Sequence, residues 1–202
     1  MNRTLIGLLL LCVWAPLPAW ADDNTNAGNP PAADSFSYSD LEPNRLREHS
    51  DYFGDTAAGT GFRFSYDFPG EVYLLGQWNH LKFDTLAAHR DLTGVGIGAH
   101  QAYNDKLSFY VDLSFMQDRF SSSTASATDD FWRLNYGFRG HMSDLLELDG
   151  AIFTERNTIF GARPFGERLG LGLDFSVLSL LLAAEHTANG NRSELSLVWA
   201  YR

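Results

Sequence analysis

Nine charged residues recur on one side of alternating stretches of this chain and suit electrostatic chemistry in an enclosed space. They are Arg63, Asp67, Asp112, Arg133, Arg139, Glu147, Asp149, Arg168 and Asp174. At an effective dielectric constant of about 20, a close pair of opposite charges gains roughly 4 kcal/mol before desolvation. Because desolvation offsets much of this gain, pairing mainly avoids the larger cost of a lone buried charge. We therefore expect a paired network of charges, and a narrow pathway for small ions is the alternative.

Histidine and acid side chains near the expected loops suit a second chemistry, hydrolysis by a water molecule that an Asp/His pair activates. The candidates for such a surface hydrolase are His49, Asp51, Asp55, His80, Asp84, His89, Asp129 and Asp130. Acids in loops are usually just solvated, and the six histidines lack the His-x-x-Glu-His spacing of zinc enzymes. The sequence therefore predicts no catalytic residue, no metal site and no cofactor, with a hydrolase at the rim as a lesser alternative.

Alternation of apolar and polar residues predicts that these charges stand on β-strands. In the stretch FYVDLSF, Val111 and Leu113 have one parity, and Asp112 and Ser114 have the other. The same pattern predicts ten strands, at 36–47, 57–68, 71–83, 91–103, 106–119, 130–141, 145–157, 164–175, 177–188 and 192–201. The first strand alternates poorly, and Pro43 interrupts its ladder. Since no segment has a sustained helical spacing of apolar residues, we expect an all-β fold.

The composition of the two faces predicts which one meets lipid. One parity carries large apolar residues such as Leu134 and Trp199, and the other carries glycine, serine and charges such as Arg133. Of the 15 basic residues only Lys82 and Lys106 are lysine, whereas soluble surfaces usually carry many lysines. We therefore expect a transmembrane antiparallel barrel with lipid outside and the charges in its lumen. A soluble secreted β-barrel or sandwich is the alternative.

The start of the chain and its links indicate the outer membrane. Residues 1–21 have the charged start, short apolar core and small-x-small end that predict a signal peptide. We expect a flexible periplasmic tether at 22–35 and the barrel domain at 36–202. Tight links such as 68–71 alternate with longer ones such as 84–91, as periplasmic turns and external loops do in such barrels. The formal charge of -10 argues against a nucleic-acid partner.

The leader, the ten amphipathic segments and the terminal strand ELSLVWAYR resemble small outer-membrane β-barrel proteins of Gram-negative bacteria. These include the OmpA-type transmembrane domain and the ten-stranded group of outer-membrane barrels. The resemblance implies an up-and-down barrel in the cell outer membrane, inserted by the assembly machinery through its C-terminal strand. In this chain Arg202 follows Tyr201, the aromatic residue with which such strands usually end.

Two enzyme families of related barrels give more specific hypotheses. The stretch EHTANG is similar to the His-x-Ser-Asn motif of outer-membrane lipid A deacylases, but Ala188 replaces the nucleophilic serine. A surface protease of the omptin type is the form that the rim-hydrolase alternative would take.

Taken together, the sequence features predict a monomer in contact with outer-membrane lipid and lipopolysaccharide. We expect a structural, envelope-integrity or surface-interaction role.

Overall fold

The structure of the protein is a computed structural model. The residues that it describes are 36, 38–69, 71–156, 163–175, 177–187 and 190–200, with the side chains of residues 163 and 164 excepted. The predicted signal peptide, the predicted tether, Ala188 and the last two residues lie outside the described residues. No helix in the described part of the chain is long and apolar enough to cross a membrane.

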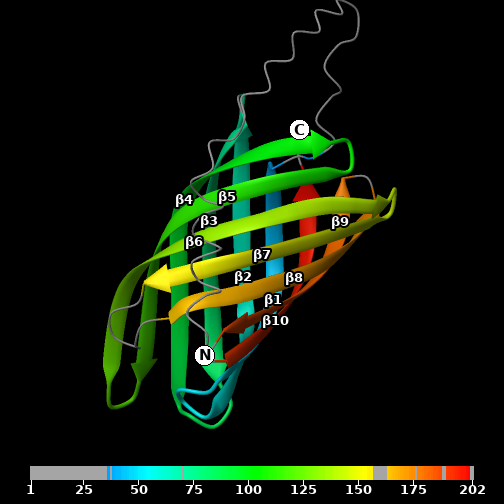
Figure 1. Cartoon of the computed structure of the whole chain (residues 1–202). Helices are drawn as coiled ribbons and strands as arrows, with labels where there is room; N and C mark the ends of the chain where they lie inside the picture. The colour runs from blue at the N-terminus through cyan, green and yellow to red at the C-terminus, as the bar shows by residue number, and fades with distance from the viewer. Residues whose placement is uncertain are drawn as a thin grey trace, which may run out of the picture. The chain divides into compact units, whose positions relative to one another are not determined.

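Ten antiparallel strands form one closed barrel (Figure 1). Their bounds are β1 Asp40–Ser50, β2 Asp55–Phe68, β3 Val72–Phe83, β4 Ala88–Asn104, β5 Leu107–Ser122, β6 Ser126–Ser143, β7 Leu146–Arg156, β8 Arg163–Phe175, β9 Leu178–Thr187 and β10 Gly190–Ala200. Each strand pairs with its neighbours in the chain, and β1 pairs with β10 to close the sheet. This is the up-and-down barrel that the alternation predicts.

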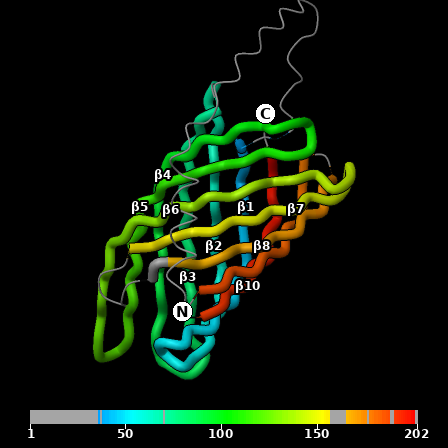
Figure 2. The backbone as a smooth tube through the Cα atoms, in the orientation of Figure 1, coloured from blue at the N-terminus to red at the C-terminus, as the bar shows by residue number. Residues whose placement is uncertain are grey.

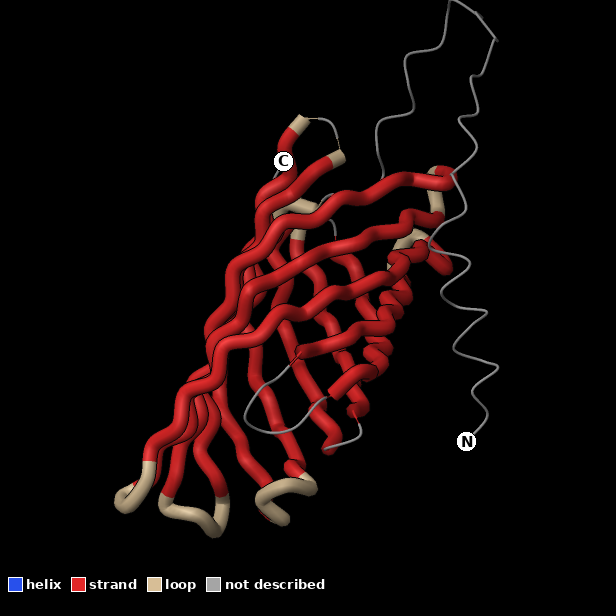
Figure 3. The backbone as a smooth tube through the Cα atoms, turned by 60° about the vertical axis from the view of Figure 1, so that its left-hand side comes forward, coloured by secondary structure: helices blue, strands red, loops and turns tan. Residues whose placement is uncertain are grey.

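Several strands run further than the alternation predicts. Strands β4, β5 and β6 have 17, 16 and 18 residues, although about 9–11 tilted residues cross the hydrocarbon of a bilayer. Residues 126–129, expected in a loop, pair instead with β5 from Asp118 to Ser121. Small and polar residues are compatible with a strand whose backbone hydrogen bonds are paired. Figure 3 shows the result, in which short loops join long strands at the lower end of the barrel.

Side chains alternate across the wall, with the apolar set outside. Val111 and Leu113 are 42% and 43% exposed, whereas Asp112 and Ser114 are 7% and 2% exposed. The same contrast between an apolar outer face and a polar inner face continues around the barrel. Figure 2 traces the backbone of this closed wall. A soluble barrel would have the opposite arrangement, so the outer face of this barrel suits lipid.

Three apolar clusters lie inside the barrel beside the charged residues. One is near the turns that join β1 to β2 and β3 to β4, and consists of Leu46, Ala57, Leu81, Phe83 and Ala88. A second consists of Leu92, Met116 and Phe131. The third, which we call the aromatic cluster, consists of Phe36, Tyr38 and Tyr73. The lumen is therefore filled by apolar as well as charged side chains.

Inward glycines make room for rings that lie across the lumen. A Cβ atom added to Gly98 would lie 2.2 Å from Cζ of Tyr73, and one added to Gly137 would lie 2.4 Å from Cζ of Tyr110. Both distances are below van der Waals contact, so a larger residue would displace the ring. The glycines of the polar parity thus allow a narrow barrel to enclose tyrosine side chains.

Candidate functional site

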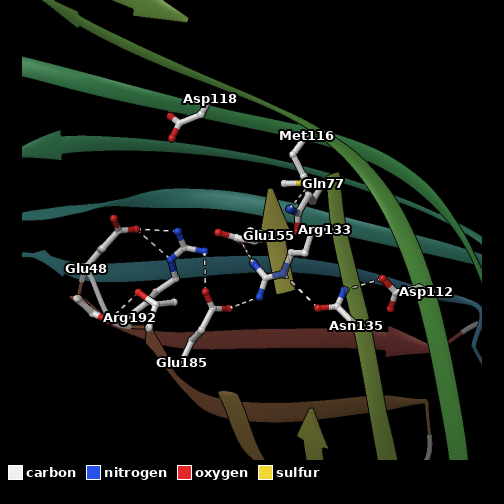
Figure 4. A network of polar contacts seen from close by, with 12 residues as sticks. Glu48, Gln77, Asp112, Met116, Asp118, Arg133, Asn135, Glu155, Glu185 and Arg192 are labelled. Carbon is white, nitrogen blue, oxygen red and sulfur yellow. Dashed lines mark hydrogen bonds and ion pairs between the residues drawn. The ribbon is translucent and has the colours of Figure 1, made fainter. Parts of the chain in front are cut away.

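Seven side chains from seven strands form a chain of alternating charges across the lumen, most of them labelled in Figure 4. We call it the arginine–carboxylate chain, and its members in order are Asp118, Arg90, Glu48, Arg192, Glu185, Arg133 and Glu155. Four carboxylates thus alternate with three guanidinium groups. The chain joins strands that are far apart in the sequence, since Glu48 lies on β1 and Arg192 on β10.

The contacts in this chain are short at most links. Arg192 Nη2 lies 2.7 Å from Glu48 Oε2, and its Nη1 lies 3.8 Å from Glu185 Oε1. Arg133 lies 2.8 Å from Glu185 and 3.3 Å from Glu155. At the other end Arg90 donates to both carboxylate oxygens of Asp118 and also pairs with Glu48. Because every charge has an opposite charge beside it, the cost of burying the set is offset by pairing.

The arginine–carboxylate chain also separates two cavities of the lumen. One cavity has a volume of about 100 Å³ and the other about 170 Å³. Arg133, Glu185 and Arg192 line both of them. Each cavity is large enough for a few water molecules. The three side chains therefore form the constriction of the lumen.

Three sequence-predicted charges form separate contacts around the larger of the two cavities. Arg63 lies 3.2 Å from Glu42 and 3.8 Å from Glu194. Arg168 pairs with Asp149, which also accepts a hydrogen bond of 3.2 Å from the hydroxyl of a tyrosine on β5. The structure thus gives Arg63, Arg168 and Asp149 partners of opposite charge inside the barrel.

Three more predicted charges and a histidine form a group near the turn between β6 and β7. Arg139 Nε donates to Glu147 at 2.9 Å. His141 Nδ1 lies 3.9 Å from Glu147 and 3.8 Å from Asp174. Ligand atoms of His141, Glu147 and Asp174 lie within 4.8 Å of one another, so these are the described residues that come closest to a metal-binding set. Arg139 already neutralises Glu147 there.

The remaining predicted charges contact neutral or histidine side chains. Asp112 accepts hydrogen bonds from the amide of Asn135 and from the hydroxyl of Tyr73. Asp67 lies 3.0 Å from Nε2 of His100. Of the nine predicted lumen charges, only Arg133 belongs to the arginine–carboxylate chain. The structure therefore distributes the nine residues over several networks instead of one.

The segment before β1 occupies the lumen near the short turns. The ring of Tyr38 stacks on His100 with 4.1 Å between centroids, and its hydroxyl donates to Ser108 Oγ at 3.1 Å. Phe36 stacks on His141 at 4.5 Å. Both aromatic residues are at most 5% exposed. Sequence reasoning placed this segment in a strand, because it could not show that the chain turns into the barrel.

Sequence reasoning missed six of the seven members of the arginine–carboxylate chain. Glu48 and Arg90 lie just beyond the predicted bounds of their strands, 36–47 and 91–103. The other four lie within predicted strands, where their position in the alternation of inward and outward residues was the signal that could have identified them. Asp118, for example, has the parity of Asp112, and this shared parity places it on the inward face of β5.

The residues considered for a rim hydrolase have other surroundings. His49 lies 3.5 Å from Asp51, but both side chains are more than half exposed. His80 lies 2.7 Å from Asp91, on the outward parity of β3 and β4. Asp55 accepts hydrogen bonds from three backbone N–H groups and so holds the neighbouring turns. In the part of the chain that the structure describes, the two His–Asp pairs thus lie on different strands.

Comparison with known proteins supports the fold. No family model and no curated protein matches the sequence. The NanC porin structure has a TM-score of 0.53 and 7% sequence identity, covering 80% of this chain and 100% of that chain. The KdgM porin has a TM-score of 0.48 and 9% sequence identity, covering 80% of this chain and 99% of that chain. The N-terminal β-barrel domain of Pseudomonas aeruginosa OprF has a TM-score of 0.41 and 10% sequence identity, covering 80% of this chain and 96% of that chain. The likeness to the NanC porin confirms the predicted outer-membrane type of barrel at the level of the fold.

Proposed function

We propose that this protein is a monomeric integral barrel of the cell outer membrane with a structural role in the envelope. The observation that carries this proposal is the arginine–carboxylate chain, which crosses the lumen between two small cavities. A permeating ion would have to separate these pairs and leave buried charges without partners, which costs several kcal/mol. The lumen therefore acts as a polar core that stabilises the barrel.

The outer wall supports the membrane part of the proposal. Exposed side chains such as Leu134, Leu171 and Leu197 are 43%, 46% and 48% exposed and would lie against acyl chains. Closure of the sheet by β1 and β10 leaves no open strand edge to pair within the bilayer. The partners that fit this wall are outer-membrane lipid and lipopolysaccharide, and β10 is the strand for the assembly machinery to recognise.

A narrow pore is the second candidate function. The two cavities lie on either side of one constriction, so a rearrangement of Arg133, Glu185 and Arg192, which line both, would connect them. Two of the structures to which this fold is similar are named as porins. A pore of this kind would conduct only when the constriction opens.

Conductance across a planar bilayer tests the two candidates. We expect wild-type protein, refolded and checked by its heat-dependent shift on a gel, to give no current steps above the bilayer background. The double variant Arg133→Ala and Glu185→Ala removes one charge of each sign from the constriction and should produce steps. The matched control, Arg156→Ala with Glu167→Ala, removes the same charges from the outer wall and should stay silent. Regular steps from the wild-type protein would overturn the closed lumen in favour of the pore.

A further inference from the structure

Basic side chains divide into two groups according to the face on which they stand. The inward arginines, namely Arg63, Arg90, Arg133, Arg139, Arg168 and Arg192, are all ion-paired. Five outward cations on the strands, Arg45, Arg47, Lys82, Arg119 and Arg156, are exposed and make no ion pair with any residue that the structure describes. Free cations on the outside are unexpected in a chain of formal charge -10.

Four of these outward cations, all except Arg156, lie in two adjacent rows of the sheet. The pairing of β1 to β5 defines one row as Arg45, Thr60, His80, Asp91 and Arg119, and the other as Arg47, Ala58, Lys82, His89 and Ser121. We call these the basic rows. Asp91 is their one carboxylate, and it already contacts His80 at 2.7 Å. The basic rows therefore form a positive patch on the outer wall.

The basic rows lie where the apolar band ends. Thr60 and Ala58 are eight and ten residues along β2 from Phe68, which stands at the short-turn end. A strand tilted by about 40° climbs roughly 2.5 Å per residue, which places the two rows about 20 and 25 Å from that end. The apolar band of such barrels is about 25 Å tall. Phe62 and Trp78, both exposed, occupy the next outward positions toward the short turns.

We propose that the basic rows bind the phosphorylated headgroup of lipopolysaccharide, its lipid A part, in the outer leaflet. This inference rests on the proposed function, because it needs the short turns to face the periplasm. Arginine forms paired hydrogen bonds to phosphate, and lysine adds a point charge. Arg47 and Lys82 flank Ala58, whose small side chain leaves space between them for one phosphate group. The acyl chains of the same lipid would then lie on Phe62 and Trp78.

Charge complementarity separates this occupant from ordinary membrane lipid. A neutral lipid would meet the apolar band equally well on every side of the barrel. A lipid with phosphate groups gains only where cations stand above that band, and in the described residues four of the five outward cations gather on β1, β3 and β5, while Arg156 stands alone on β7. Each basic residue near an anionic lipid surface strengthens binding by about fivefold.

Native mass spectrometry of the folded full chain in detergent tests the proposal. The probes are bisphosphorylated lipid A, the same lipid A with its phosphates removed, and phosphatidylglycerol. We expect bisphosphorylated lipid A to bind at least tenfold more tightly than the other two. In the variant Arg45→Gln, Arg47→Gln, Lys82→Gln that affinity should fall about a hundredfold. Equal binding of dephosphorylated lipid A or of phosphatidylglycerol would overturn the proposal.

A single-residue comparison controls for loss of charge alone. Lys82→Gln should weaken binding about fivefold, whereas Lys106→Gln, in the turn between β4 and β5, should leave it unchanged. Equal loss in both variants would refute a site at the basic rows. The heat-dependent gel shift distinguishes this outcome from failure of the proposed function. A compact wild-type barrel that lacks the lipid preference refutes the site alone, whereas absence of a compact barrel refutes both.

Discussion

Substitution of Val111 by arginine tests the orientation of the whole wall. Val111 faces outward on β5, four residues from the start of that strand at Leu107. At roughly 2.5 Å per residue along the membrane normal, it lies about 10 Å inside an apolar band about 25 Å tall. A guanidinium group there is far from both edges of the band. The expected cost is about 2–4 kcal/mol of folding free energy in lipid, or roughly a 30-fold to 1,000-fold loss in the folded-to-unfolded ratio.

The assay is reversible denaturant unfolding of the barrel in phosphatidylcholine vesicles. Its matched control is Thr124→Arg, since Thr124 is exposed in the turn between β5 and β6. That variant should change the free energy of unfolding by less than about 0.5 kcal/mol. If the two arginine variants lost the same stability, Val111 would not face lipid, and the inside-out arrangement would be wrong.

Three further variants probe the inside of the barrel. Arg133→Met should cost about 3–5 kcal/mol in the same unfolding assay because Glu155 loses its arginine partner and Glu185 keeps only the longer contact to Arg192; a loss below 1 kcal/mol would contradict the importance of the constriction. Gly98→Val should cost about 1–3 kcal/mol, since its side chain would displace the ring of Tyr73, and an unchanged unfolding midpoint would argue against the close approach. Tyr38→Ala should lower the free energy of unfolding by about 2–4 kcal/mol through loss of a buried stacked ring. A free energy of unfolding equal to that of the wild-type protein would show that the ring adds nothing to stability.

Alternation predicted the ten strands but not their ends. It works where one face meets lipid and the other meets charge, as at Val111 and Asp112. It fails at the strand ends opposite the short turns, where residues 126–129 show little contrast of polarity between the two parities. Pro43 weakened the prediction for β1, yet its position in the structure pairs with Phe62 inside a continuous register. Proline is tolerated in a strand where its missing N–H group is not needed for the ladder.

The partners of the lumen charges were beyond prediction from sequence. Parity shows that Arg133 faces inward, but its partner Glu185 is 52 residues away in the chain. Which charges meet depends on the stagger of the strands around the barrel, and that stagger follows from the register of all ten pairings. The outward cations Arg45 and Arg47 are arginines, as the inward cations are. Residue type alone could therefore not separate a lipid contact from a lumen contact.

The seam between β1 and β10 has a consequence for how the barrel forms. Glu48 receives its Arg192 partner across 144 residues, and Glu194 receives the amide of Asn44 across 150. Contacts of such long sequence separation form late, because the entropy of closing a long loop must be overcome first. Until β10 arrives, Glu48 lacks one of its two guanidinium partners and β1 has an unpaired edge. Closure is therefore an all-or-none step that joins hydrogen bonding and charge neutralisation, and a chain stalled before it would be a ready substrate for envelope proteases.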